Sequence, residues 1–407
     1  MKNADWTKTW LPPIAVAMGL VMTGLAAFFM YIQATATTLH PNPQDVKSAM
    51  VSTPLPKWAD AVKQSQEIVR AGLTAQNVPG LSVAVGVDGD VVWAEGFGWA
   101  DLQNQVPVAP GTRFRIGHVS KALTSAGVGL LREQGRLHLD AEIQEYVPAF
   151  PRKQWPVTLR QLMGNVAGIR HYRDTEWGDK PTVRCERASE GLQSFSQAPL
   201  LFEPETQYRY STYGWVLVSA AVEAAANEPF FTFMRSKVFM PLGMADTVAD
   251  FPTEPIPNRA TSYYRQLESE RTSNVDYSCF AGAGAFLSTA SDLVRFGFAM
   301  RTLLKPETVS MLQTRQQLRS GEETEYGLGW MLDTVELAGT RTPLAGHASR
   351  TIEGASTSFL TFPELGLVVA VMANRSFADP RSIALDIAQT FAALPRPGLK
   401  PGTSKDR

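Results

Sequence analysis

Two strand-forming segments, one near each end of the chain, constrain the fold most. Residues 81–87 and 91–94 flank an Asp-Gly-Asp turn and predict a β-hairpin. Residues 357–362 and 367–372 flank a Pro-Glu-Leu-Gly turn and predict a second hairpin. Between them, the chain is rich in helical patterns from residue 119 to about residue 240. Strands at both ends with helices between them predict an α/β (α+β) fold, in which the first and last strands pair in one antiparallel sheet flanked by helices and a helical lobe.

The same patterns predict one folded domain at residues 58–393. Apolar residues at helical spacing predict a helix over residues 58–76, and residues 383–393 predict a closing helix. The preceding residues 34–57 are polar and contain prolines, so we expect a linker there. Residues 394–407 are rich in Pro, Gly and Lys, and we expect a disordered tail.

The composition excludes several classes of protein. The chain has 407 residues, 38 basic and 39 acidic side chains and a net charge of −1, so it lacks the excess of Lys and Arg that nucleic-acid binding needs. No Cys-x-x-Cys or His-x-x-x-His spacing for a metal occurs in it. The Ala-Gly-Ala-Gly run at residues 281–284 is not followed by the Gly-Lys-Ser/Thr of a phosphate loop. We therefore expect no metal, no cofactor and no nucleic-acid partner.

A long uncharged segment lies near the N-terminus. Residues 9–44 contain no Asp, Glu, Lys or Arg, and residues 14–32 are apolar apart from Gly and Thr. About 20 such residues cross a bilayer, and two lysines precede them. We predict a cytoplasmic segment at residues 1–10 and a single transmembrane anchor at residues 11–33, with the rest of the chain outside the cytoplasm, as in a periplasm. The alternative is a cleaved signal peptide, because Ala-Thr-Ala at residues 34–36 resembles a cleavage site.

The chain has two cysteines, Cys185 and Cys279. Outside the cytoplasm they could form a disulfide, but their separation in sequence says nothing about their proximity. Two buried free thiols are an equally open alternative.

Four short segments are candidate functional motifs: Phe114-Arg-Ile-Gly-His-Val-Ser-Lys121, Tyr208-Arg-Tyr-Ser-Thr-Tyr-Gly-Trp215, Phe280-Ala-Gly-Ala-Gly-Ala-Phe-Leu-Ser-Thr289 and Gly346-His-Ala-Ser349. With Tyr326-Gly-Leu-Gly-Trp330 and other short matches, they resemble the serine β-lactamase and penicillin-binding-protein superfamily, in the branch of class C β-lactamases, DD-peptidases and the mitochondrial β-lactamase-like proteins. The likeness covers roughly residues 60–390 and keeps the family's motif order. It implies a β-lactamase/transpeptidase-like fold and a serine-hydrolase site.

The resemblance assigns roles to individual residues. In the family, a Ser-x-x-Lys motif in the first turn of a helix supplies the nucleophile and a lysine on one helix face. Lys121 matches that lysine, Tyr210 matches the tyrosine of the second motif, and Thr212 lies where relatives have Asn. His347 matches the first residue of the third motif, whose strand lends a backbone N–H to the oxyanion hole.

The nucleophile is where the chain departs from the family, because His118 stands three residues before Lys121 in place of the serine. Ser120 lies about 100° round the helix from Lys121, so it does not replace the missing hydroxyl. Ser125, four residues beyond Lys121, points deeper along the helix. His118 has three interpretations: a nucleophile towards activated acyl groups, a general base for water, or a side chain that only fills a silent pocket.

The wall of the site also departs from the family. Ser349 replaces the Gly that lets a substrate backbone approach closely, and we expect Arg350 to crowd the same wall. The segment at residues 164–168 has lost polar groups that relatives carry there.

These changes favour an impaired or inactive family member that acts by binding. The binding partner could be a peptide, a peptidoglycan fragment, an acyl compound or a partner protein, and the chain could form homo-oligomers. The alternative is an active hydrolase (peptidase, esterase or lactamase-like) that uses Lys121 and Tyr210 with His118 or water.

Overall fold

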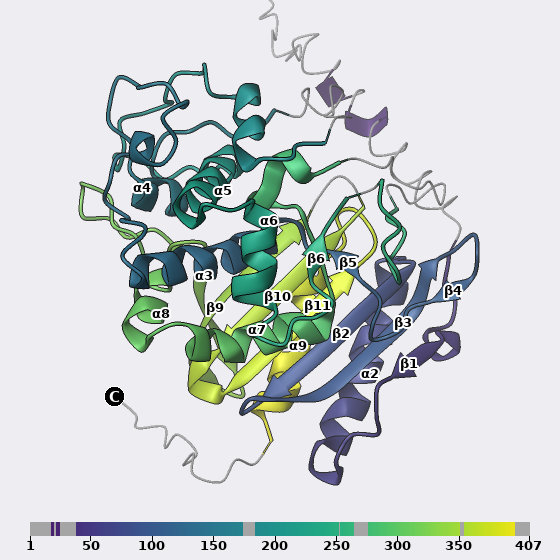
Figure 1. Cartoon of the computed structure of the whole chain (residues 1–407). Coiled ribbons are helices and arrows are strands. Elements are labelled where there is room, and N and C mark those ends of the chain that lie inside the picture. The colour runs from purple at the N-terminus through teal and green to yellow at the C-terminus, as the bar shows by residue number, and fades with distance from the viewer. Residues whose placement is uncertain are drawn as a thin grey trace, which may run out of the picture.

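An eight-stranded antiparallel sheet forms the centre of the fold (Figure 1). The computed structural model describes residues 18–19, 22–24, 38–173, 184–251, 253–263, 276–350 and 354–394. The sheet order is β1-β3-β2-β11-β10-β9-β8, and β4 pairs with β3 off this path. The strands are β1 (Ser48–Met50), β2 (Gly80–Val87), β3 (Asp90–Asp101), β4 (Val106–Pro107), β8 (Met331–Leu337), β9 (Thr340–Arg350), β10 (Ser356–Phe362) and β11 (Leu367–Ala373).

Both predicted hairpins are confirmed, as β2–β3 and β10–β11. The expected pairing of the two ends is also present, because β2 pairs with β11 with Val83 opposite Val371. Strand β3 extends beyond the predicted end, through two glycines that lower strand propensity. Those glycines allow close packing: a Cβ at Gly96 would lie 2.5 Å from the backbone oxygen of Val108.

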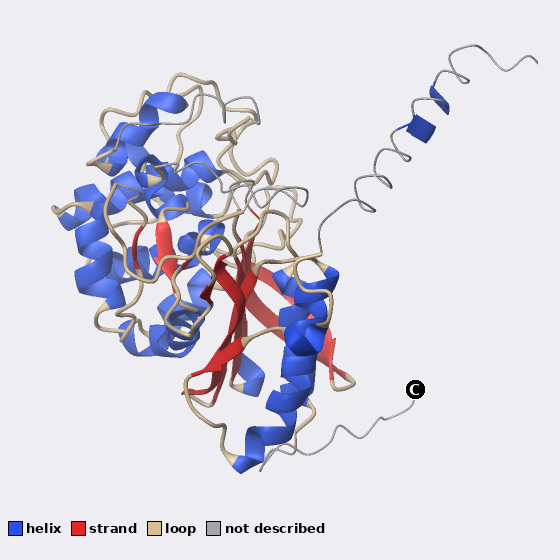
Figure 2. Ribbon diagram, turned by 90° about the vertical axis from the view of Figure 1, so that its right-hand side faces the viewer, coloured by secondary structure: helices blue, strands red, loops and turns tan. Residues whose placement is uncertain are grey.

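Helices cover the two faces of the sheet. The predicted helices at the two ends are confirmed as α2 (Pro56–Ala75) and α9 (Pro380–Ala392), which pack together on one face. The opposite face packs against α7 (Ala290–Leu303) and the helical lobe. Figure 2 shows the sheet between a long helix on one side and this lobe on the other. Strand residues alternate between the two apolar layers, as a sheet buried on both faces requires.

The helical lobe and its border hold short elements that position the site. The further helices are α3 (Ser120–Glu133), α4 (Leu159–Met163), α5 (Thr212–Ala226), α6 (Phe230–Phe233) and α8 (Pro306–Leu312). The short helical turns are η1 (Pro43–Asp45), η2 (Gly117–Val119), η3 (Ile143–Glu145), η5 (Ala188–Ser194), η6 (Met234–Phe239), η7 (Ser278–Ala283) and η8 (Pro363–Leu365). A small sheet of β5 (Phe114–Arg115), β7 (Phe286–Ser288) and β6 (Val248–Ala249) leads the chain into η2.

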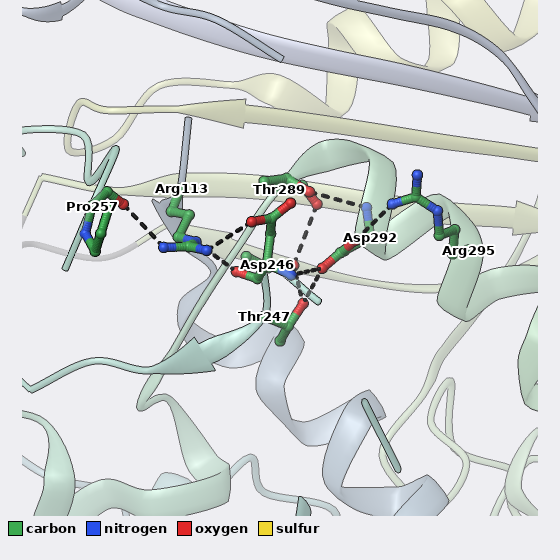
Figure 3. Close-up of polar contacts among 8 residues, drawn as sticks. Arg113, Asp246, Thr247, Pro257, Thr289, Asp292 and Arg295 are labelled. Atoms are coloured by element: carbon green, nitrogen blue, oxygen red, sulfur yellow. Dashed lines mark hydrogen bonds and ion pairs between the residues drawn. The ribbon is translucent and has the colours of Figure 1, made fainter. Parts of the chain in front are cut away.

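A polar network holds the loop before β6 against the start of α7 (Figure 3). Asp292, fully buried, accepts hydrogen bonds from the Asp246 backbone N–H at 2.9 Å and from Thr247 Oγ1 at 3.0 Å. Arg295 pairs with the same carboxylate at 2.8 Å, and Arg113 pairs with Asp246 at 2.7 Å. Because Arg113 directly precedes β5, the network fixes the small sheet from which the first motif continues.

Cys185 and Cys279 form a disulfide, with their Cα atoms 5.0 Å apart. The sequence left this pairing open. The bond joins the residues just before η5 to η7, so it ties two segments of the helical lobe together.

Several terminal predictions fall outside the described residues. These are the cytoplasmic segment at residues 1–10, most of the anchor at residues 11–33 and the tail from residue 395. Within the described ranges, no helix combines the length and apolar character needed to cross a membrane. Part of the expected linker is structured, because β1 pairs with β3 through Ala49 opposite Gly96.

Candidate active site

The first motif enters the site at the N-terminus of α3. Strand β5 pairs with β7, and the chain then turns at Gly117, whose φ of +48° is the left-handed conformation that glycine adopts without a Cβ penalty. The turn η2 carries His118, and Lys121 follows in the first turn of α3 with its side chain fully buried. The expected helical placement of the motif lysine is therefore found.

The second motif enters at the N-terminus of α5. Ser211 caps this helix by accepting from the Gly214 N–H at 3.0 Å, and its hydroxyl donates to the Arg170 carbonyl at 2.9 Å. The cap holds Tyr210 and Thr212 on either side of it, and both side chains face Lys121.

The third motif lies on β9, which forms the opposite wall. Gly346 is needed there because a Cβ would lie 2.2 Å from the Phe359 backbone oxygen on β10. His347 and Ser349 follow on the strand, and both are buried. The three segments that the resemblance predicted are thus adjacent in space.

Lys121 is the buried amine at the centre of the site. Its Nζ lies 2.5 Å from Tyr210 Oη and 3.5 Å from Thr212 Oγ1, and no described carboxylate pairs with it. Burial holds the pKa of the Lys121 amine well below its usual range and raises the pKa of the Tyr210 hydroxyl well above its own. Both shifts disfavour the charged form of the group, and the 2.5 Å contact allows the amine and the phenol to relay a proton.

His118 stands three residues before Lys121, where the resemblance leads us to expect the nucleophile. Its Nε2 lies 3.3 Å from Thr212 Oγ1, and its ring is partly exposed. Burial, followed by the charges of Lys121, His347 and His171, holds the pKa of His118 well below 6.5. The imidazole is therefore neutral at pH 7 and able to accept a proton.

The His118 backbone N–H, the donor that a family nucleophile offers to an oxyanion, already has a partner. It donates to Ser349 Oγ at 3.0 Å. The Ser349 side chain thus occupies space next to the nucleophile position, as expected from the loss of the Gly. The expectation for Arg350 is wrong: this side chain pairs with Asp379 at 3.0 Å and donates to the Ala378 carbonyl, so it turns towards the start of α9.

His347 is held as a neutral hydrogen-bond acceptor. Its Nδ1 lies 3.0 Å from the Ala348 carbonyl, which can only accept, so Nδ1 carries the proton. Its Nε2 then accepts from the Tyr326 hydroxyl at 3.0 Å. Burial and the nearby Lys121 charge lower the pKa of His347 to about 3.

Three supporting residues were missed as site residues. Tyr326, which bonds His347, was predicted only as part of a family motif. A tyrosine hydroxyl within the Tyr-Gly-x-Gly-Trp segment was the sequence signal for this contact. Asn165 Oδ1 accepts a hydrogen bond from the Ser211 N–H at 3.1 Å. The segment at residues 164–168, in which we expected polar groups to be lost, therefore keeps one polar contact to the second motif. His171 Nδ1 accepts the Thr212 N–H at 3.0 Å, which places it inside the site.

The two nearby serines make no hydrogen bond to Lys121, Tyr210 or His118. Ser125 Oγ donates to the Ala122 carbonyl at 2.7 Å and accepts from Trp330 Nε1 at 3.1 Å. Ser120 Oγ is buried without a hydrogen-bond partner among the described atoms. In the described ranges, His, Cys, Asp and Glu side chains form no group of three or more suited to a metal ion.

Residues 65–393 match the Beta-lactamase family, and the chain belongs to it. It is similar to the human mitochondrial serine beta-lactamase-like protein LACTB, with 29% identity over 86% of this chain and 84% of that protein. A class C beta-lactamase shares the fold with a TM-score of 0.69 and 17% identity, covering 85% of this chain and 98% of that one. An octameric penicillin-binding protein homologue from Pyrococcus abyssi shares it with a TM-score of 0.67 and 22% identity over 80% and 76% of the two chains.

Proposed function

We propose that this protein binds an acyl or peptide ligand, such as a peptidoglycan fragment, without forming a serine acyl-enzyme. One observation carries the proposal. The nucleophile position holds an imidazole, and the backbone N–H beside it is bonded to Ser349 Oγ. An incoming carbonyl would therefore meet no attacking hydroxyl, and it would have to displace an internal acceptor from the oxyanion donor.

The polar groups that remain suit recognition. Lys121 and Tyr210 can offer donors to a carbonyl or carboxylate oxygen, and the partly exposed rings of His118, His171 and Tyr210 form the surface that a ligand would reach first. Keeping an amine buried without a carboxylate partner costs stability. Because the buried amine lowers stability, we expect Lys121 to contact the ligand.

The test measures covalent and non-covalent binding on the same full-length protein. A fluorescent penicillin and a fluorophosphonate probe are expected to leave it unlabelled, whereas calorimetric titration with a muramyl pentapeptide is expected to show saturable binding without product. Tyr210→Phe should weaken this binding, and Tyr208→Phe, which removes a hydroxyl from an exposed side chain two residues away, should not. Labelling of any serine would overturn the non-acylating proposal, and an absence of heat would overturn the binding proposal.

Hydrolysis is the second candidate, favoured by the 2.5 Å contact between Lys121 and Tyr210. The Lys121 amine and the neutral imidazole of His118, which both contact Thr212 Oγ1, could activate water against an ester or amide. Steady turnover of p-nitrophenyl acetate that is lost in both Lys121→Met and Tyr210→Phe would favour this candidate over binding alone.

We also propose that residues 11–33 anchor the protein in a membrane, with residues 58–393 outside the cytoplasm. The apolar run at residues 14–32 supports the anchor, and the Cys185–Cys279 disulfide supports an oxidising compartment. The protein should then stay in the membrane pellet after carbonate extraction, and external protease should digest it. A mature N-terminus just after residue 36 would instead show a cleaved signal peptide.

A further inference from the structure

A second pocket opens between the α6–η6 helix and β6, separate from the candidate active site. Its volume is about 350 Å³, within the range of small-molecule sites. Phenylalanines supply much of its wall, namely Phe231, Phe239, Phe251 and Phe286. None of the candidate active-site residues lines it.

The helix that forms this wall contains an uncommon π-helical turn. Residues Met234–Phe239 adopt it, and the Met240 N–H bonds the Arg235 carbonyl at 3.0 Å, five residues back. Such turns are rare and often occur at functional sites. Arg235 lies four residues from both Phe231 and Phe239, and all three line the pocket.

The other face of this helix is fixed against the helix that carries Lys121. A Cβ added at Gly127 of α3 would lie 2.9 Å from Met234 Sδ, so the two helices are in close contact. The pocket-lining face is therefore held by the fold rather than shaped by a ligand.

The charged groups around the pocket leave a positive excess. Glu254, in the wall, is paired with Arg184 at 2.6 Å. Arg235 is exposed, and no carboxylate among the described residues pairs with it. The pocket thus combines an aromatic interior with a cation that lacks a described partner.

Arg113 adds oriented donors at the end of the wall. Its guanidinium has five N–H groups. It donates to the Asp246 carboxylate at 2.7 Å and to the Asp246 and Pro257 carbonyls, each at 3.1 Å (Figure 3). These contacts use three donors and leave two for another acceptor.

We propose that this pocket binds a small carboxylate with an aryl or short acyl group. The apolar part lies among the phenylalanines, and the carboxylate meets Arg235 and the remaining donors of Arg113. The size of the pocket and its aromatic wall suit an aryl or short acyl group. The excess positive charge favours a carboxylate over a neutral or cationic head group.

The test uses two matched probes on the full-length protein, followed by ¹⁹F NMR. The probes are 3-(4-fluorophenyl)propanoate and its neutral amide. The carboxylate is expected to bind saturably and about tenfold more tightly than the amide, as one charge-assisted hydrogen bond would provide. Arg235→Gln should remove this preference. Lys237→Gln, which removes a charge from an exposed neighbour on the same helix that does not line the pocket, should preserve it.

A second pair of variants tests the location. Thr232→Trp fills the pocket from an exposed lining position and should abolish binding, whereas Ser236→Trp, exposed on the same helix but outside the lining, should not. No saturable binding, equal affinity for the two probes, equal loss in Lys237→Gln, or unchanged binding in Thr232→Trp would each overturn the proposal.

Discussion

The His118 backbone N–H donates a hydrogen bond to Ser349 Oγ at 3.0 Å, across 231 residues of sequence. Under the proposed function, His118 stands where the resemblance expects the attacking hydroxyl, and Ser349 Oγ accepts from the adjacent N–H. The proposal therefore predicts that both side chains act on one reaction step, the capture of an acyl carbonyl.

Restoring both features should restore acylation. His118→Ser alone is expected to label slowly with a fluorescent penicillin, because the hydroxyl lies on one helix face with Lys121 but Ser349 still holds the neighbouring N–H. His118→Ser combined with Ser349→Gly should label about fivefold faster, since the lost acceptor was worth roughly 1 kcal/mol as a hydrogen bond. Pseudo-first-order labelling rates measure the difference.

The single Ser349→Gly variant is the control for this experiment. It frees the N–H without adding a nucleophile, so it should stay unlabelled. If the double variant also stayed unlabelled, some feature other than these two side chains would block the site.

The imidazole of His347 should make the fold sensitive to acid. Its pKa is about 3 in the folded protein, against 6.5 for an ordinary histidine. Between these two pH values, His347 is protonated in the unfolded chain but not in the folded protein. The free energy of unfolding therefore falls as the pH drops from 6.5 towards 3. His347→Gln should make the slope of unfolding free energy against pH shallower by up to about 1.4 kcal/mol per pH unit in this window.

Urea denaturation between pH 4 and pH 7 measures this slope. His138→Gln, at an exposed histidine, controls for the loss of an imidazole as such. An unchanged slope in His347→Gln would show that His347 is protonated, or solvated, in the folded protein.

Replacing the buried lysine should stabilise the protein at neutral pH. Burial lowers the pKa of Lys121 in the folded state only, so folding is opposed by the preference of this amine for its proton in the unfolded chain. Lys121→Met keeps the length of the side chain, and it should raise the free energy of unfolding at pH 7 by about 1–3 kcal/mol after the lost Tyr210 contact is counted.

The pH dependence distinguishes this effect from simple packing. The free energy of unfolding of the wild-type protein should rise with pH up to the ordinary lysine pKa of 10.5. Below that pH the unfolded chain binds the Lys121 proton more tightly than the folded protein does. The advantage of Lys121→Met should therefore shrink between pH 7 and pH 9.5 in urea denaturation. Lys237→Met, at an exposed position, is the matched variant, and a less stable Lys121→Met protein would contradict the prediction.

Loss of the Cys185–Cys279 disulfide should destabilise the helical lobe. The bond closes a loop across 94 residues, for which chain entropy suggests about 4–5 kcal/mol and typical measurements give about 2–4 kcal/mol. The Cys185→Ser, Cys279→Ser double variant should unfold at correspondingly lower urea. Reduction of the wild-type protein with dithiothreitol should produce the same shift, and no shift from either treatment would show that the pair contributes little.

The sequence by itself determined the two hairpins, the two terminal helices and their order. The turn between residues 87 and 91 and the apolar alternation around it identify β2 and β3, and helical spacing identifies α2 and α9. These signals are local, because a turn or an amphipathic face is encoded by neighbouring residues. The family resemblance then indicated that Lys121, Tyr210 and His347 would lie together.

Only the tertiary structure decided what the site residues touch. The sequence could not show that Ser349 bonds the His118 N–H, that Arg350 turns to Asp379, or that Cys185 and Cys279 pair. Each contact joins segments far apart in the chain, or depends on the direction in which a side chain leaves its strand. Such contacts depend on how whole helices and strands pack against one another, and local sequence patterns do not specify that packing.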